Sequence, residues 1–294
     1  MRVLHVTGAG RSGSTLLGSM LGQIPGFCNV GEAGYLWERG LAAGGACGCG
    51  RPVRLCPVWS AVLERAFPEL DELAELARRH RAATRGWRVM AAALPGHAVP
   101  APGDHLRLLA RLYRALAEVT GCAVVVDSTK PAPYGHLLAR TPDVELKVVH
   151  LVRDPRAVAW SWQRRKAGEG ADAMAVRPAW QSALLWHAGN RAAARLSGDD
   201  YLLLRYEDLV AEPEHWLRRV ARLVGHAEPE IPEIDADGVL LRPTHTVAGN
   251  VDRHRTGRTP LRLDSQWAGA MPAATRRLVE LLTFPAGRRY GYHR

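Results

Sequence analysis

The chain has 294 residues, of which 47% are hydrophobic and 23% are charged, and its formal net charge is +10. This composition is typical of a globular protein with a packed core, and it excludes a disordered or fibrous chain. The positive charge comes almost entirely from arginine, so it can reflect composition alone, but it also suits an anionic ligand. A small polyanion is favoured over nucleic acid because no basic stripe interleaved with aromatic residues occurs.

The N-terminal segment has the pattern of a strand, a glycine-rich turn and a helix. Residues 3–6 are apolar, residues 8–13 contain three glycines, and a helix is predicted over residues 14–23. No pattern of a signal peptide precedes the strand, and no apolar run of about 18 residues occurs. We therefore expect a cytoplasmic protein without a membrane partner.

The rest of the chain alternates short apolar runs with helical periodicity. Further strands are predicted at residues 123–126, 146–152 and 201–205. Helices are predicted at residues 156–166, 178–196, 214–224 and 271–282. Residues 58–120 also have helical spacing of their apolar residues, with an interruption at 95–103. Residues 31–57 and 228–264 are predicted to be loops. This alternation predicts one α/β domain over residues 1–294, with a mostly parallel central sheet, helices on both faces and a helical insertion at about 58–120.

Three of the five cysteines cluster in the first long loop. Cys47, Cys49 and Cys56 lie within ten positions, whereas Cys28 and Cys122 lie apart. The cluster is compatible with reduced thiols in a loop, with a disulfide or with a zinc site. A zinc site needs four ligands, so the fourth would have to come from Cys28 or from a histidine.

The glycine turn has the setting of a phosphate-binding loop. Gly8, Gly13 and Thr15 fit the pattern G-x-x-x-x-G-K-[ST], but Ser14 occupies the lysine position. The missing lysine would contact the β- and γ-phosphates of a nucleoside triphosphate, so hydrolysis of ATP or GTP is disfavoured. Arg11 can supply the charge for a different anion, and the strand–loop–helix setting predicts a P-loop-like three-layer fold.

Two segments resemble the nucleotide site of sulfotransferases that use 3'-phosphoadenylyl sulfate (PAPS). The run GRSGSTLL at residues 10–17 resembles the 5'-phosphosulfate loop of the branch that contains tyrosylprotein and carbohydrate sulfotransferases, as a bacterial member. The run HLVRDPRAVAWS at residues 150–161 resembles the 3'-phosphate motif, in which arginine offers a planar fork of donors. The resemblance implies donor contacts from Arg11, Ser12, Gly13, Ser14, Thr15, Leu16, Arg153, Ser161, Arg165, Tyr206, Gly249, Asn250 and Arg253. Gln266 stands where some relatives carry a lysine.

The resemblance also implies roles in catalysis. Glu32 matches the position of the catalytic glutamate, while Arg11 and Lys130 are placed to stabilise the leaving phosphate. His245 and His5 are reserve candidates for the base. The expected reaction converts PAPS to adenosine 3',5'-bisphosphate (PAP) without a required metal. The acceptor is expected to be a small molecule (a metabolite, sugar or natural product), bound by residues 31–57 and 167–177 and the helical insertion.

Two other functions remain open from the sequence. A P-loop kinase or nucleotide hydrolase would use Asp127, at the end of an apolar strand, to hold magnesium. A non-catalytic nucleotide-binding or interaction module would need no base at all. PAP should stabilise the protein if it is a sulfotransferase, and ATP with magnesium should stabilise it if it is a kinase or hydrolase. Neither ligand should stabilise it if it is a non-catalytic interaction module.

Overall fold

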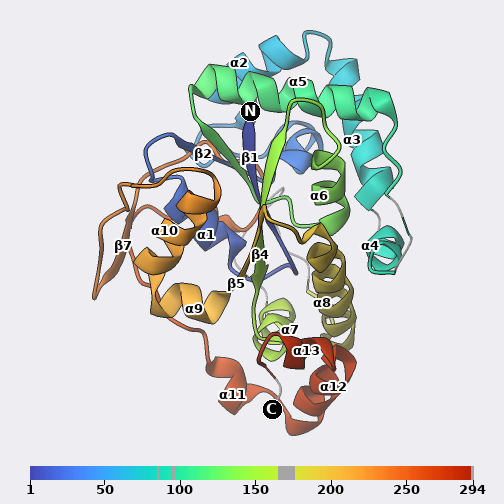
Figure 1. The fold of residues 1–294 in the computed structure, drawn as a ribbon, viewed down its shortest axis with the longest axis vertical. Helices are drawn as coiled ribbons and strands as arrows, with labels where there is room; N and C mark the ends of the chain where they lie inside the picture. Colours follow the sequence, from blue (N-terminus) through green and yellow to red (C-terminus); the bar gives the residue numbers. More distant parts are fainter. Residues whose placement is uncertain (85, 95–96, 98, 165–175, 293–294) are drawn as a thin grey trace.

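The centre of the protein is a five-stranded sheet. The computed structural model describes residues 1–84, 86–94, 97, 99–164 and 176–292. All four strand pairings are parallel, which confirms the predicted sheet (Figure 1). The strand order is β2 (Phe27–Gly31), β3 (Val124–Asp127), β1 (Arg2–Thr7), β4 (Glu145–Val152) and β5 (Tyr201–Arg205).

Alternation along each strand builds two cores. Successive side chains of a strand point to opposite faces, so Val3 packs in one apolar cluster while Leu4 and Val6 pack in the other. One face is covered by α1 (Ser14–Leu21) and α10 (Pro213–Leu223), and the other by α5 (Gly103–Thr120), α6 (Ala132–Leu138) and α8 (Ala179–Ala193) (Figure 1). The predicted three-layer arrangement is therefore present.

Among the described residues between β2 and β3, four α-helices follow one another. They are α2 (Pro57–Ala66), α3 (Leu70–Thr84), α4 (Gly86–Ala92) and α5. Leu109, Leu112 and Leu116 recur at three- and four-residue spacing along α5, and each is almost fully buried. The predicted helical spacing and its interruption before residue 103 are confirmed.

One predicted loop contains strands, and one strand was not predicted. Residues 228–264 contain a three-stranded antiparallel sheet made of β6 (Ile234–Asp235), β7 (Gly238–Leu241) and β8 (Gly257–Thr259). These strands have two to four residues, too few to show a clear alternating pattern. The strand β2 was not predicted, because its five residues mix polar with apolar side chains.

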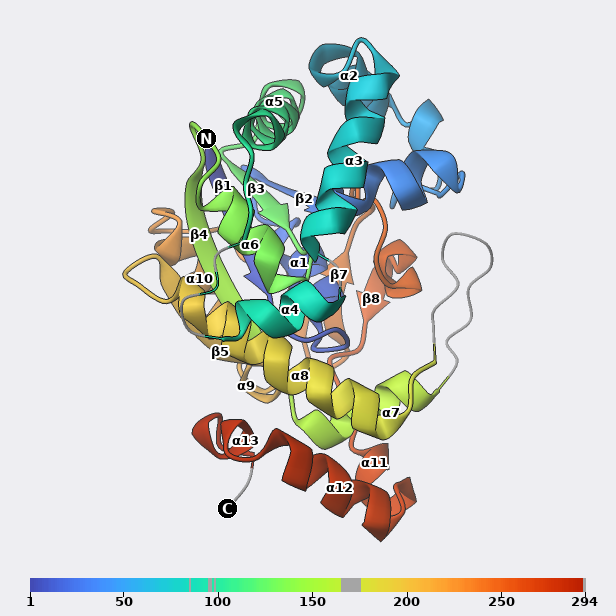
Figure 2. The same cartoon turned by 90° about the vertical axis from the view of Figure 1, so that its right-hand side faces the viewer.

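The C-terminal helices lie at the bottom of the molecule as drawn in Figure 2, below α7 (Pro155–Gln163) and α8. They are α11 (Gln266–Ala270), α12 (Ala273–Thr283) and α13 (Ala286–Arg289), and α12 packs on α7 and α8. The helix α7 ends at Gln163 rather than at the predicted residue 166. The short α9 (Tyr206–Ala211) links β5 to α10. In the part of the chain that the structure describes, no helix combines the length and the apolarity needed to span a bilayer.

Candidate active site

The carboxyl ends of β1, β3 and β4 border a cavity of about 640 Å³. Parallel sheets bind ligands at this edge, where the loops after the strands converge. Of the residues predicted for the site, the cavity lining contains Arg11, Gly13, Ser14, Thr15, Leu16, Glu32, Lys130, Arg153, Ser161, Tyr206, Gly249 and Asn250. Ser12 and Arg253 are absent from the described lining, and Arg165 lies outside the described residues.

Two aromatic rings hold the glycine turn in place. Gly13 has φ +95°, and a Cβ atom there would lie 2.3 Å from the Tyr206 ring. A Cβ atom at Gly10 would lie 2.8 Å from the Trp162 ring. Both glycines are therefore needed for close contact, and Gly13 also for its left-handed backbone. Arg11 has φ +70° although it carries a side chain, so the loop holds this residue in a conformation that L-residues disfavour.

The end of the turn provides donors for an anion. Helix α1 begins at Ser14 with no side-chain cap on its first backbone N–H groups, and such a helix start attracts negative charge. Within the described chain, the buried Ser14 Oγ has no hydrogen-bond partner. Ser12 Oγ instead donates to the Ala9 carbonyl oxygen at 2.8 Å. The Ser12 hydroxyl therefore closes the loop, while Ser14 faces the cavity.

The two arginines of the predicted donor site meet at the glycine turn. Arg11 is 8% exposed and lies over the Trp162 ring, with its Cζ 4.8 Å from the ring centroid. Burial lowers the pKa of Arg11 from its ordinary value. Arg153 lies over the Tyr206 ring at 4.6 Å and donates from Nη1 to the Arg11 carbonyl oxygen at 3.2 Å. Both arginines therefore line the same cavity beside the glycine turn.

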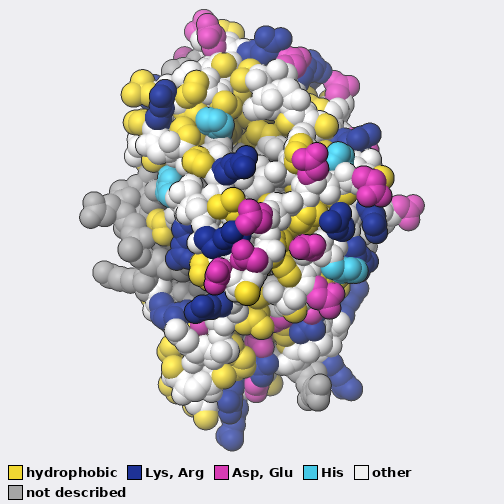
Figure 3. Space-filling view, turned by 90° about the vertical axis from the view of Figure 1, so that its left-hand side faces the viewer, with side chains coloured by type: hydrophobic (Ala, Val, Ile, Leu, Met, Phe, Trp, Pro, Cys, Tyr) yellow, Lys and Arg dark blue, Asp and Glu magenta, His cyan; other side chains and the backbone are white. Residues whose placement is uncertain are grey.

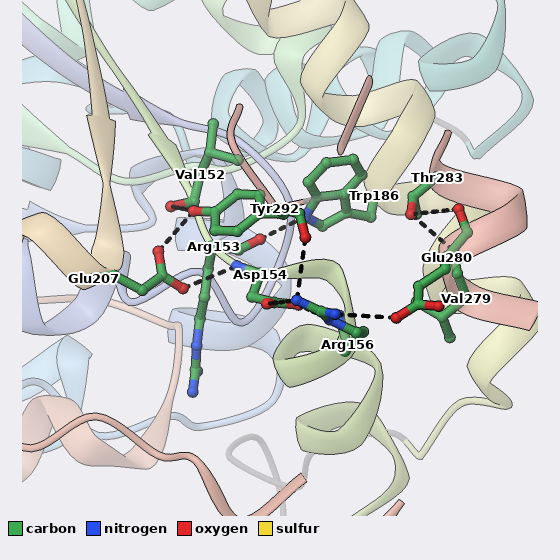
Figure 4. Close-up of polar contacts among 10 residues, drawn as sticks. All are labelled: Val152, Arg153, Asp154, Arg156, Trp186, Glu207, Val279, Glu280, Thr283 and Tyr292. Carbon is green, nitrogen blue, oxygen red and sulfur yellow. Dashed lines mark hydrogen bonds and ion pairs between the residues drawn. The ribbon is translucent and has the colours of Figure 1, made fainter. Parts of the chain in front are cut away.

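A polar network fixes the backbone around Arg153 (Figure 4). The Arg153 carbonyl oxygen accepts from Trp186 Nε1 at 2.9 Å, and the Asp154 backbone N–H donates to Glu207 Oε1 at 3.0 Å. The other oxygen of Glu207 accepts from the Tyr292 hydroxyl at 2.6 Å. Figure 4 shows the Arg153 side chain extending away from these contacts. These contacts hold the backbone at the end of β4, from which the Arg153 side chain extends.

Glu32 and Lys130, which both line the cavity, form an ion pair. Glu32 is 5% exposed; its Oε1 pairs with Lys130 Nζ, and its Oε2 lies 3.6 Å from Arg39 Nη1. Its backbone N–H donates to the Val247 carbonyl oxygen at 2.8 Å. A Cβ atom at Gly249 would lie 3.3 Å from Glu32 Oε1, so the segment after β7 packs closely on this carboxylate.

The other titratable candidates lie elsewhere. His5 is fully buried, and burial lowers its pKa to about 3, so it stays neutral. Asp127 is also fully buried; it accepts from the Tyr113 hydroxyl at 2.5 Å and from the Thr129 backbone N–H at 2.5 Å. Asp127 is absent from the described cavity lining, so it does not occupy the position that a magnesium ligand of a kinase would need. The His245 ring contacts cysteine sulfur atoms.

The charge of the cavity suits a polyanion. Its described lining contains eight Arg or Lys side chains and three Asp or Glu side chains. On the face drawn in Figure 3, by contrast, the basic and acidic side chains of the described residues are interspersed. The motifs did not indicate the lining residues Arg164, Arg255 and Arg262, and Arg39 and Arg177 were expected only as members of the two acceptor loops. Arginine is so abundant in this chain that its presence alone carried no signal.

The position of Gln266 shows how one departure from the family pattern is accommodated. Gln266 Oε1 accepts from Arg164 Nη1 at 2.7 Å, and Arg164 Nη2 also pairs with Asp264 at 2.5 Å. Arg164 itself lines the cavity. A cation is thus present beside this position although the chain lacks the lysine found in some relatives.

Comparisons with known proteins point to one family. Residues 4–230 match the model of the sulfotransferase family. Carbohydrate sulfotransferase 3 of Homo sapiens is 28% identical over 177 residues, which are 53% of this chain and 35% of that protein. Carbohydrate sulfotransferase 2 of Homo sapiens is 32% identical over 155 residues, which are 39% of this chain and 28% of that protein. The chain thus spans about a third of the length of these curated relatives.

Two solved structures align with nearly the whole chain. The sulfotransferase domain from the Synechococcus PCC 7002 olefin synthase has 22% sequence identity and a TM-score of 0.47, with 97% of this chain and 95% of that chain covered. The sulfotransferase domain from the curacin biosynthetic pathway has 17% identity and a TM-score of 0.48, with 96% of each chain covered.

Proposed function

The chain belongs to the sulfotransferase family, and we propose that it transfers a sulfuryl group from PAPS to a hydroxyl of a small acceptor molecule. The observation that carries this proposal is the shared cavity. The glycine turn with Arg11, the strand-end Arg153 and the Glu32–Lys130 pair all line it. Anion-binding groups and a carboxylate base therefore lie within reach of one bound donor.

The donor is proposed to bind through both of its phosphate-bearing ends. The backbone N–H groups at the start of α1, Ser14 Oγ and Arg11 would bind the 5'-phosphosulfate. Arg153 and Ser161 would bind the 3'-phosphate, with Tyr206 beside the nucleotide. Because the cavity has an excess of basic side chains, the donor's several negative charges favour this site over the protein surface.

The reaction is proposed to run in line across the cavity. The acceptor oxygen forms a bond to sulfur while the bond between sulfur and the 5'-phosphate oxygen breaks. Glu32 takes the acceptor proton, and the negative charge that develops on the departing PAP is stabilised by Arg11 and Lys130. Lys130 contacts Glu32 and lines the same cavity as Arg11, which supports a role for Lys130 beside both the base and the leaving group.

The acceptor is proposed to enter beside Glu32. Tyr35 and Arg39 from the predicted acceptor loop line this wall, and Arg177 lines it from the second predicted loop; residues 167–175 lie outside the described residues. Arg39 Cζ lies 4.5 Å from the centroid of the Tyr35 ring. Burial raises the pKa of Tyr35 to about 12, so its hydroxyl remains a hydrogen-bond donor at neutral pH. An aromatic ring and hydroxyl donor suit a sugar, metabolite or natural product.

A labelled-donor experiment tests this function. The protein is incubated with sulfur-labelled PAPS and a metabolite extract, and products that gain the label are identified. In Glu32→Gln, we expect transfer to fall by about 10²–10⁴-fold while PAP still raises the melting temperature. Glu38→Gln, which alters a nearby carboxylate outside the described lining, should keep its activity. Normal transfer by Glu32→Gln refutes the assignment of the base, and stabilisation by ATP with magnesium but not by PAP refutes the assignment of the donor.

A further inference from the structure

Three cysteines and one histidine converge outside the catalytic cavity. The potential ligand atoms of Cys47, Cys49, Cys56 and His245 all lie within 4.8 Å of one another. His245 Nδ1 lies 3.2 Å from Cys56 Sγ and 3.8 Å from Cys47 Sγ. Nearly 200 residues separate the histidine from the cysteines in the chain, so the fold itself brings this group together.

The distances from the His245 ring nitrogen to two of the sulfur atoms are close to those in a tetrahedral zinc site. Zinc lies about 2.3 Å from thiolate sulfur and about 2.0 Å from imidazole nitrogen, which places sulfur atoms about 3.8 Å apart and sulfur and nitrogen about 3.5 Å apart. The two distances from His245 Nδ1 to sulfur fall on either side of this value. We propose that Cys47, Cys49, Cys56 and His245 bind one Zn²⁺ ion. Four protein ligands leave no open position, so the site is structural rather than catalytic.

The surrounding backbone is shaped to hold the ligands. Gly50 has φ +86° and donates its N–H to the Cys47 carbonyl oxygen at 2.8 Å, which closes a tight turn around Cys49. A Cβ atom at Gly48 would lie 2.5 Å from the Thr244 carbonyl oxygen, so glycine permits close approach of the two segments. Trp59 is fully buried, and its Nε1 donates to the His245 carbonyl oxygen at 2.9 Å. Such outer contacts orient the ligands of a metal site.

The alternatives explain the arrangement less completely. Cys47 and Cys56 are fully buried, and all five cysteines are free in the structure. A disulfide would use two sulfur atoms and give no role to the third sulfur or to the imidazole. Three thiolates, a neutral imidazole and Zn²⁺ carry one net negative charge. Buried Arg253 donates from Nη2 to the Ala46 carbonyl oxygen at 3.1 Å, so a cation stands beside the loop that would carry this charge.

The zinc ion would fasten the segment after β7 to the first long loop. Two residues after His245, Val247 pairs with the end of β2: its N–H donates to the Val30 carbonyl oxygen at 2.9 Å, and its carbonyl oxygen accepts from the Glu32 N–H at 2.8 Å. The metal therefore holds the backbone that positions Glu32, without touching the cavity itself. Because the proposed role of zinc is to stabilise the fold, its content and its effect on stability can be measured without any substrate.

Metal analysis of the full chain tests the inference. The protein is purified without an affinity tag and under reducing conditions, and its metal content is measured by inductively coupled plasma mass spectrometry. We expect one zinc ion per chain, released by a mercurial reagent together with a fall in the melting temperature. Zinc X-ray absorption of the unmodified protein should show three sulfur neighbours and one nitrogen neighbour. This measurement keeps the test decisive even if ligand variants fail to fold.

Matched cysteine variants identify the ligands. Cys56→Ser and Cys49→Ser should lose most of the bound zinc, whereas Cys28→Ser, which changes a cysteine outside the cluster, should retain it. The inference is overturned if purified protein contains no zinc and takes up none when it is supplied. It is also overturned if Cys56→Ser binds as much zinc as the unmodified chain, or if intact mass shows that two cluster cysteines have lost their hydrogens to a disulfide.

Discussion

The contact between Gly13 and Tyr206 should decide the stability of the donor site. In Gly13→Ala, the new methyl group would lie 2.3 Å from Cδ2 and 2.6 Å from Cε2 of the Tyr206 ring. The ring must therefore move, and it carries the face on which Arg153 rests at 4.6 Å. The substitution also places a side chain at φ +95°, which L-residues disfavour.

The size of the effect follows from these two contributions. A left-handed conformation costs an L-residue roughly 1–2 kcal/mol, and the displaced cation–π contact is worth about 0.5–2 kcal/mol. Gly13→Ala should thus lower the free energy of unfolding by about 1.5–4 kcal/mol, or the melting temperature by roughly 2–7 °C. PAP should bind more weakly as well, because Arg153 loses the ring that positions it.

A matched glycine separates the two contributions. Gly121 has φ +65°, and a Cβ atom there would meet nothing within 4 Å, so Gly121→Ala should cost only the backbone contribution of about 1–2 kcal/mol. Thermal and urea unfolding are measured for both variants, alone and with PAP. In a Tyr206→Ala background, which removes the ring, Gly13→Ala should cost no more than Gly121→Ala. If Gly13→Ala is as mild as Gly121→Ala in the unmodified background, the ring does not constrain the loop and the reasoning fails.

Three further predictions concern Arg153 and two buried groups outside the described cavity lining. Arg153→Lys removes the planar fork of donors and should weaken PAP binding by about 10- to 100-fold by calorimetry, whereas Arg65→Lys on the exposed surface should change nothing. Burial raises the pKa of Asp127 from 3.8 to about 6, so the folded protein binds this proton more tightly than the unfolded chain does. The contribution of Asp127 to the free energy of unfolding should fall by about 3 kcal/mol as the pH rises from 3.8 to about 6. Urea unfolding of Asp127→Asn should lack this dependence of stability on pH. Tyr292→Phe leaves a carboxylate oxygen of Glu207 without its donor at 2.6 Å and should lower the free energy of unfolding by about 1.5–3 kcal/mol; an unchanged melting temperature would contradict that role.

The sequence contained enough information to predict the phosphate loop and the sheet. The glycine turn follows a short, mostly apolar run that contains Val3, Leu4 and Val6, and such a run is typical of a buried parallel strand. Arg153 follows another strand of the same kind. Because parallel strands end at the same edge, the two arginines had to approach one another. Local pattern and sheet geometry thus fixed this half of the site.

The other half depends on contacts between distant segments. Nothing in the residues around Glu32 predicts that Lys130 pairs with it, or that Gly249 packs against it. The strands of the second sheet are too short for periodicity to show. His245 could be considered as a fourth ligand for the cysteines, but its convergence with them required the fold. Such pairings depend on tertiary structure rather than on local propensity.

The segment after residue 230 contributes rigidity more than chemistry. The family model ends there, and the residues proposed for catalysis all precede it. Tyr292 nevertheless anchors Glu207 behind Arg153, while Val247 and Gly249 hold the backbone and carboxylate of Glu32. Each wall of the cavity is therefore supported by this later part of the chain. Catalysis by preorganised charges depends on such support, because a displaced charge stabilises the transition state poorly. Substitutions in the C-terminal segment should consequently lower the rate of transfer even where they touch no substrate.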